Sequence, residues 1–579
     1  MNKLAAVARG DIPADFVIRN ARIANVCSGE YELSDVAVYS GKVAGISSGY
    51  EGRITFDAEG RVLIPSMIDG HVHIEDTMMT PDNFAYLAAK HGTGTVLADP
   101  HEIANTLGMA GLEYMFRASQ GLPIDIFYGA PSCVPASDLE TPYQELDMSN
   151  LRDMFSRGLV QHLGEMMNFP AVIAGDSESW GKILAAGNVP LTGHAPGVSG
   201  KSLNAYLSSG IDSDHECTTL AEAREKLSRG MWLMIREGAS FRDLRTLLPI
   251  IKANPLNAAR CMAVSDDITA RYLLEIGHMD EKMRIMLGSG IDPFVALRMV
   301  TLTPAEYFRL YDRGAITPGK LADFALLDAD VMDEGFRVSE VWKNGRLVMR
   351  DSDVFTRDVQ EQAAPLIRNK VTHIPSVKDI RVPLASPCLE RSLSMNVIGV
   401  TEGTVITQTL QIRPRVIDGF AVQDSKEDIA KIVVLERHND TGRFGVGFVK
   451  GLSIRQGALG SSVAHDAHNF VVAGMDDESI ISALHALADM GGGLVCTLGE
   501  EVKASFALPI GGLMSTLNAE QVCENLTIME DTAESLGVNM PHPFMVLSFL
   551  CLSVIPELRI TDLGYVDITK GGKQPVFVR

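Results

Sequence analysis

Two histidines with a single residue between them, His71 and His73, stand at the end of a short apolar run. Side chains alternate along a β-strand, so both imidazoles would point to the same side. Two neutral imidazoles presented from a rigid strand end supply half of a divalent-metal site. Taken alone, the pair is equally compatible with two surface histidines, and residues farther along the chain decide between these interpretations.

Further residues of metal-ligand type follow, each at the end of an apolar, strand-like run. With the first pair, the predicted ligands are His71, His73, Glu165, His194, His215 and Asp266. Each has an ordinary alternative explanation, such as a helix N-cap for Asp266. Those explanations would have to hold independently at five strand ends in register, so the pattern favours one metal site.

These side chains can meet only if the strands that carry them are neighbours. Short β-rich runs alternate with helical stretches between about residues 63 and 311, which is typical of parallel βα units. Eight predicted strands end near His71, Asp99, Ala130, Glu165, His194, His215, Arg236 and Asp266. Eight units in roughly 250 residues match an α/β (β/α)8 barrel of the TIM type, whose active sites lie at the C-terminal strand ends.

The segments on either side of this region are rich in short strands and turns. Asn344-Gly345 between two apolar runs predicts a hairpin. We expect the two segments to pair into one small β-sandwich domain. The predicted division is residues 1–63 and 312–351 for the sandwich, 64–311 for the catalytic barrel, 352–383 for a linker, and 384–579 for a C-terminal α+β domain.

Composition excludes several classes of partner. The 51 Lys and Arg residues against 73 Asp and Glu residues give a net charge of −22, which would repel nucleic acid and anionic membranes alike. The eight cysteines show no paired spacing, so a disulfide framework is not expected. The N-terminus lacks the apolar stretch of a signal peptide, and the apolar run at residues 544–555 is short for a membrane span. We therefore expect a cytoplasmic protein.

The order of the predicted ligands resembles that of the amidohydrolase superfamily over about residues 15–350. Within it, the chain looks most like the microbial adenine deaminase family, and this similarity extends to the C-terminus. The motifs that carry it include Asp99-Pro-His-Glu102, Gly193-His-Ala-Pro, Asp214-His-Glu216, Arg236-Glu237-Gly and Ser461-Ser-Val-Ala-His465-Asp-Ala-His468-Asn469. One departure is Ser265, where threonine is expected before the acidic pair; the hydroxyl group is retained.

The resemblance implies hydrolytic deamination of adenine to hypoxanthine and ammonia by a metal-activated hydroxide, in purine salvage. It implies Mn²⁺ or Fe²⁺ rather than Zn²⁺, with one or two ions per subunit, and a glutamate such as Glu165 can bridge two ions. It also implies a small purine base as the partner and a homodimer or higher homo-oligomer. A ligand set of nitrogen and oxygen atoms without thiolate is compatible with either metal.

The chemistry requires a group that moves protons between water and the substrate, and an acid beside the ring nitrogen. We predict that Asp266 is the proton shuttle, since it would contact both the metal and the water. The candidate acids are Glu102, Glu165, Glu216 and Glu237. Each could instead orient a ligand histidine.

Other residues near the predicted site keep more than one interpretation. His101 could be an extra ligand, a substrate contact or an ordinary loop residue. Arg236 could bind a substrate edge or neutralise nearby carboxylates. For His465 and His468, a structural network or a lid over the barrel mouth is favoured over a second ligand set.

Two rival functions remain open at this stage. An amide-hydrolysing relative, such as an N-acetylhexosamine-phosphate deacetylase, would need a cationic phosphate pocket. Few Lys or Arg residues lie near the predicted strand ends, which favours a neutral substrate. A non-catalytic, allantoinase-like metal protein predicts loss of the eighth-strand acid, yet Asp266 is present.

Overall fold

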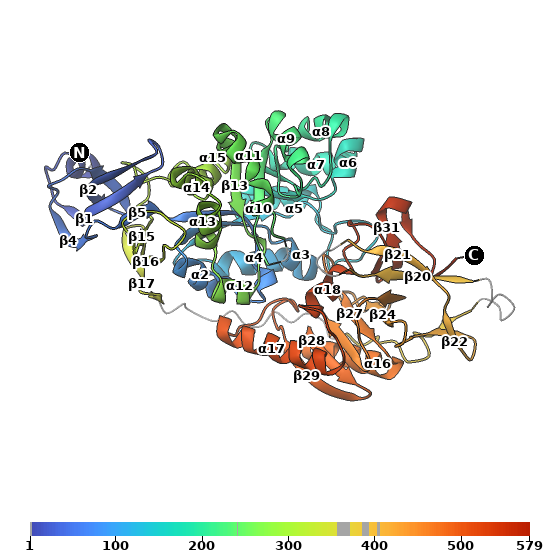
Figure 1. Cartoon of the computed structure of the whole chain (residues 1–579). Coiled ribbons are helices and arrows are strands. Elements are labelled where there is room, and N and C mark those ends of the chain that lie inside the picture. Colours follow the sequence, from blue (N-terminus) through green and yellow to red (C-terminus); the bar gives the residue numbers. More distant parts are fainter. Residues whose placement is uncertain (1–2, 240, 356–370, 385–392, 402–405, 579) are drawn as a thin grey trace. The chain divides into compact units, whose positions relative to one another are not determined.

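The computed structural model describes residues 3–239, 241–355, 371–384, 393–401 and 406–578 (Figure 1). Contacts divide the chain into two compact units. The first comprises Met1–Pro100, Met115–Ser132 and Leu151–Gln362, and the second comprises His101–Tyr114, Cys133–Asn150 and Ala363–Arg579. The four-part division drawn from the sequence stays a prediction, and residues 356–370 of its linker lie outside the described residues.

Parallel strands form the centre of the first unit. They are β6 (Met67–His73), β7 (Thr93–Ala98), β8 (Asp125–Ala130), β9 (His162–Met166), β10 (Leu191–Gly193), β11 (Ser213–Asp214), β12 (Trp232–Arg236), β13 (Cys261–Val264) and β14 (Asp266–Asp267). One ladder has the order β10-β9-β8-β7-β6-β14, and a second has the order β11-β12-β13. The strand ends agree with those expected from the sequence.

Two junctions join these ladders into a closed barrel. Only Ser265 separates β13 from β14, so the eighth strand pairs with β12 at its start and with β6 at its end. Across the other junction, the Gly193 N–H donates to Ser213 Oγ at 3.2 Å. A Cβ atom on Gly193 would lie 2.2 Å from the Ser213 carbonyl oxygen, so this approach requires glycine. The predicted α/β barrel is confirmed.

Helices between the strands supply the apolar surface that the strands bury against. They include α2 (Pro81–Lys90), α7 (Ser177–Ala186), α8 (Gly200–Leu207), α9 (Leu220–Ser228) and α13 (Met279–Gly288). In one core cluster, Leu233 and Ile235 of β12 are buried together with Met279 and Met283 of α13. Strands held this way present their C-terminal ends at fixed positions.

A nine-stranded sheet flanks the barrel within the first unit. Its strands are β1 (Ala14–Asn25), β2 (Glu30–Tyr39), β3 (Lys42–Ile46), β4 (Gly52–Asp57), β5 (Val62–Pro65), β15 (Phe324–Leu327), β16 (Val338–Lys343), β17 (Arg346–Arg350) and β18 (Asp353–Val354). Antiparallel pairing of β5 with β15 joins the segments before and after the barrel, as predicted. The predicted hairpin turn, Asn344-Gly345, has φ values of 51° and 69°, as a type I′ turn requires.

The second unit is built on another nine-stranded sheet. Its central strands include β24 (Ile429–Leu435), β25 (Phe444–Lys450), β26 (Ala458–Ser461) and β27 (Phe470–Gly474). This unit also contains the helices α16 (Asp477–Met490) and α17 (Ala519–Ser535). The short helix α3 (His101–Leu107) belongs to this unit as well. Among the described residues, none of the helices is long and apolar enough to cross a membrane.

Candidate active site

The carboxylate of Glu165, on β9, lies between two pairs of imidazoles. Its Oε1 atom is 3.3 Å from His73 Nε2 and 3.8 Å from His71 Nε2. Its Oε2 atom is 2.9 Å from His194 Nδ1 and 3.2 Å from His215 Nε2. One carboxylate therefore faces a different histidine pair with each of its two oxygen atoms.

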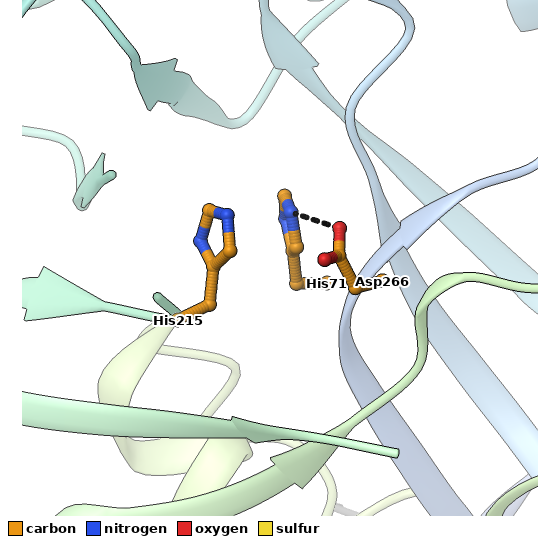
Figure 2. A group of neighbouring side chains, drawn as sticks. All are labelled: His71, His215 and Asp266. Carbon is orange, nitrogen blue, oxygen red and sulfur yellow. Dashed lines mark ion pairs between the residues drawn. The ribbon is translucent and has the colours of Figure 1, made fainter. Parts of the chain in front are cut away.

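Asp266, on β14, closes the first of these groups. Its Oδ1 atom lies 3.2 Å from His73 Nε2 and 3.4 Å from His71 Nε2. Figure 2 shows the His71 ring between the side chains of His215 and Asp266, and the His71 and His215 rings are stacked with centroids 4.3 Å apart. Asp266 has a φ of 59°, a left-handed conformation that is uncommon outside glycine and clusters at functional sites.

The donor set of this cluster fits a divalent metal. In each of several groups of three residues, one ligand atom per residue lies within 4.8 Å of the others. These groups are His71, His215 and Asp266; His71, His73 and Glu165; Glu165, His194 and His215; and His73, Asp266 and Asp267. Nitrogen and oxygen donors of this kind suit Mn²⁺, Fe²⁺ and Zn²⁺. All six residues that the sequence predicted as ligands are therefore brought together.

The carboxylates and imidazoles of this cluster shift one another's pKa values. Burial opposes ionisation of Glu165 and Asp266, but the neighbouring imidazoles outweigh it and hold the pKa of both carboxyl groups well below the usual range. Burial likewise opposes protonation of His215, but Glu165 raises its pKa to about 9. Metal binding requires neutral imidazoles, so a cation would displace protons from this site.

Backbone groups fix the orientation of the ligands. His73 Nδ1 donates to the Asp99 carbonyl oxygen at 3.1 Å, which directs His73 Nε2 toward Glu165 and Asp266. The Asp99 carboxylate in turn accepts the Glu165 N–H at 2.6 Å. Asp99, at the end of the second barrel strand, thus holds ligands from two other strands.

A buried carboxylate that the sequence analysis did not single out ties the first and last strands together. Asp69 is fully buried, and its Oδ1 accepts the N–H groups of His71 and Ser265 at 3.3 and 3.1 Å. Its Oδ2 lies 2.9 Å from His278 Nε2. The available signal was a carboxylate inside an otherwise apolar strand, since such a residue needs buried partners.

A buried ion pair fixes the two loops that carry His194 and His215. Asp214 directly precedes His215 and accepts the N–H of Ala195, the residue after His194, at 2.7 Å. Lys226 Nζ lies 2.9 Å from Asp214 Oδ2 and 2.6 Å from the Ala195 carbonyl oxygen. Burial opposes ionisation of Asp214, but Lys226 dominates and lowers its pKa to about 2.

We expect Lys226→Met to lower the free energy of unfolding by about 3–5 kcal/mol at pH 7, because Asp214 would remain buried without its partner. In the native chain the depressed Asp214 pKa stabilises the fold above pH 4, and this contribution is lost as pH falls toward 2. In the variant, Lys226 no longer offsets burial and the Asp214 pKa rises, so the penalty should shrink as acid protonates the carboxylate. Urea unfolding at pH 7 and pH 4 measures both effects. The exposed Lys252→Met is the matched control; equal destabilisation by both substitutions would contradict the prediction.

Arg236 lies among carboxylates. Its Nη1 atom is 2.5 Å from Glu216 Oε1 and 3.2 Å from Asp266 Oδ2, and its Nη2 atom is 3.1 Å from Asp243. Burial disfavours the guanidinium charge, but these carboxylates dominate and raise the Arg236 pKa. Of the two interpretations left open by the sequence, the geometry favours neutralisation of carboxylates.

Glu216 and Glu237 differ in their surroundings. Glu216 Oε1 lies 3.5 Å from His215 Nε2 and 3.7 Å from His194 Nδ1, and its side chain is 17% exposed. Glu237 donates its backbone N–H to Val264 O at 3.0 Å, and burial raises the pKa of its carboxyl group. Glu216 thus lies beside the histidine cluster and is partly exposed, whereas Glu165 is buried among the imidazoles.

His101 and Glu102 are grouped with the two C-terminal histidines, inside the second unit. Glu102 Oε1 is 2.8 Å from His465 Nδ1 and 3.4 Å from His101 Nε2, and Glu102 Oε2 contacts His468 Nε2. Burial raises the pKa of Glu102, but His465 and His468 dominate and hold it well below the usual range. Sequence spacing could not connect these residues, because Glu102 and His465 are 363 positions apart.

Comparisons with known proteins place both parts of the chain in one family. Residues 62–348 match the family described as the amidohydrolase family, and residues 404–572 match the adenine deaminase C-terminal domain. An adenine deaminase from Desulfatibacillum aliphaticivorans is 44% identical over 98% of this chain and 98% of its own length. The chain belongs to the adenine deaminase family. Adenine deaminase 2 from Carboxydothermus hydrogenoformans is 42% identical over 99% of both chains.

Among solved structures, a beta-aspartyl dipeptidase from Fervidobacterium islandicum AW-1 is similar to this chain. The match covers 60% of the present chain and 98% of the dipeptidase, with 18% identity and a TM-score of 0.45. The sequence-based assignment to adenine deaminases of the amidohydrolase superfamily is confirmed by the family matches and the full-length relatives. The amidohydrolase family is metal-dependent, and this family member carries His, Glu and Asp groups that could hold the ion.

Proposed function

We propose that this protein hydrolyses adenine to hypoxanthine and ammonia in purine salvage. The observation that carries the proposal is the meeting of four imidazoles with Glu165 and Asp266 at the strand ends of a barrel whose full-length relatives are adenine deaminases. Arg236, the cation at this cluster, already contacts three carboxylates. That arrangement favours a neutral base over the phosphorylated sugar of a deacetylase.

The six residues would hold Mn²⁺ or Fe²⁺ in preference to Zn²⁺. When bound, a divalent cation supplies Lewis acidity, which lowers the pKa of a coordinated water from about 15.7 toward about 7. We assign two ions per subunit, because the two oxygen atoms of Glu165 face different histidine pairs. His71, His73 and Asp266 would serve one ion, and His194 and His215 the other.

The remaining steps are assigned to side chains. Asp266 takes a proton from the attacking water as the C6–O bond forms, and then delivers it to the amino group as the C6–N bond breaks. Glu216 takes the other proton of that water and donates it to the ring nitrogen next to C6, which leaves the Glu216 carboxylate as it began. It is the candidate acid that lies beside the histidine cluster and remains partly exposed. Arg236 positions Glu216 and Asp266 relative to each other.

The function is tested by comparing ammonia release from adenine with acetate release from an N-acetylated hexosamine phosphate, with Mn²⁺ or Fe²⁺ supplied in both assays. We expect stoichiometric ammonia and hypoxanthine from adenine, and no acetate from the sugar. Acetate release without ammonia would replace this proposal with the deacetylase.

A cytoplasmic homodimer or higher homo-oligomer completes the proposal. The resemblance to the adenine deaminase family supports it, and the net charge of −22 argues against binding to nucleic acid or an anionic membrane surface. Light scattering coupled to size exclusion would measure the oligomer; a monomeric mass at micromolar concentration would contradict it.

A further inference from the structure

A second cluster of metal-ligand side chains lies in the second unit. Glu102, His465 and His468 each present one ligand atom, and these atoms lie within 4.8 Å of one another. All three residues are buried, with exposures of 2%, 4% and 0%. The barrel ligands do not contribute to this group of three.

The cluster is assembled from two rigid pieces of the second unit. Glu102 comes from α3, in which every residue is buried. His465 and His468 come from the loop between β26 and β27, two strands that pair with each other in the sheet. The ring of His465 is stacked on Phe549 with centroids 4.9 Å apart, which fixes its plane. Residues held this way are suited to a fixed coordination geometry.

The nitrogen atoms are oriented toward Glu102. His465 Nδ1 lies 2.8 Å from Glu102 Oε1, and His468 Nε2 contacts Glu102 Oε2. The other nitrogen of His468, Nδ1, accepts the Ala464 N–H at 3.1 Å, so in this geometry the ring proton lies on Nε2, against Glu102. The backbone of His468 has a φ of 54°, a left-handed conformation that favours glycine. A histidine kept at such a position indicates that its side chain is required there.

The buried charge around the cluster calls for a cation. Asp466 stands between the two histidines in sequence and is also buried. Buried carboxylates are stable when they are paired or coordinate a metal. A divalent ion between Glu102 and the two imidazoles would replace the proton that His468 Nε2 otherwise carries against Glu102.

We propose that Glu102, His465 and His468 form an additional metal site for a divalent first-row transition ion. Two imidazoles and one carboxylate favour Mn²⁺, Fe²⁺, Co²⁺ or Zn²⁺ over Ca²⁺ and Mg²⁺, which prefer all-oxygen surroundings. Three protein ligands leave positions for water or for His101, whose Nε2 lies 3.4 Å from Glu102 Oε1. The sequence favoured a structural network or a lid for His465 and His468. The proposed metal site replaces that interpretation.

The direct test uses the unaltered full chain. Crystals grown with Mn²⁺ or Zn²⁺ are measured on both sides of the absorption edge of the metal, and anomalous difference maps are compared. We expect a peak within bonding distance of Glu102, His465 and His468, in addition to the peaks at the barrel cluster. The barrel peaks act as the internal reference. Their presence without a peak at Glu102 would overturn the proposal, and the cluster would then be a hydrogen-bonded network.

A second measurement counts metal in solution. Purified chains carrying Glu102→Gln or His468→Gln are dialysed against metal-free buffer and analysed by inductively coupled plasma mass spectrometry. We expect each variant to lose about one ion per chain relative to the unaltered protein. The exposed His485→Gln, on α16 of the same unit, is the matched control and should retain the full content. Full metal content in both folded cluster variants would overturn the proposal.

Discussion

Replacing Asp266 with asparagine is expected to lower kcat for adenine by about a hundredfold to ten-thousandfold, the range found when a general acid–base group is lost. The amide cannot accept the proton of the attacking water. Metal content should remain largely intact, because His71, His73 and Glu165 would still hold the ion. Steady-state ammonia release and metal analysis on the same preparation measure both effects.

The control for this substitution is Asp212→Asn, which changes a half-buried aspartate just before β11. It should retain kcat near that of the unaltered protein. Unchanged turnover in Asp266→Asn would refute the role of proton shuttle. Loss of metal together with loss of turnover would instead assign Asp266 a ligand role only.

Glu165→Gln is expected to have the largest effect on metal content. The amide carries no charge and offers only one oxygen, so the substitution disrupts both histidine pairs at once. We expect metal affinity and kcat/KM to fall by more than the 10–100-fold that is typical when an outer partner of a ligand is removed. Competition with a chelator, followed by metal analysis and activity assay, measures the change.

The exposed Glu178→Gln, on α7, is the matched control for charge removal in the same unit. A Glu165→Gln chain that kept two ions per subunit through chelator challenge would contradict the bridging role. Circular dichroism of both variants separates metal loss from unfolding. Together, the Asp266 and Glu165 variants distinguish a proton-transfer defect from a coordination defect.

Much of the site could be predicted from the sequence because barrel strands place their last residues in one ring. His71 and His73 share a strand face by simple alternation, and Glu165, His194 and His215 each end a neighbouring strand. The strand ends were predictable even for β10 and β11, which contain only three and two residues.

Contacts between distant segments could not be predicted in the same way. The Asp69–His278 pair spans 209 positions and the Glu102–His465 pair spans 363, and no local periodicity reports such pairings. The ion pairs of Arg236 could not be predicted either, since its three carboxylate partners lie on separate segments. Local pattern locates strand ends, whereas side-chain partners depend on tertiary packing.

Pairing of β5 with β15 also constrains the order of events during protein synthesis. The N-terminal half of that sheet leaves the ribosome before the barrel, yet the synthesis of its partners β15 to β17 is complete only when translation reaches Arg350. Until then Leu63 and Ile64 have an unfilled edge, which in a nascent polypeptide invites aggregation. The N-terminal strands of this sheet therefore gain their partner edge only after the whole barrel has been synthesised.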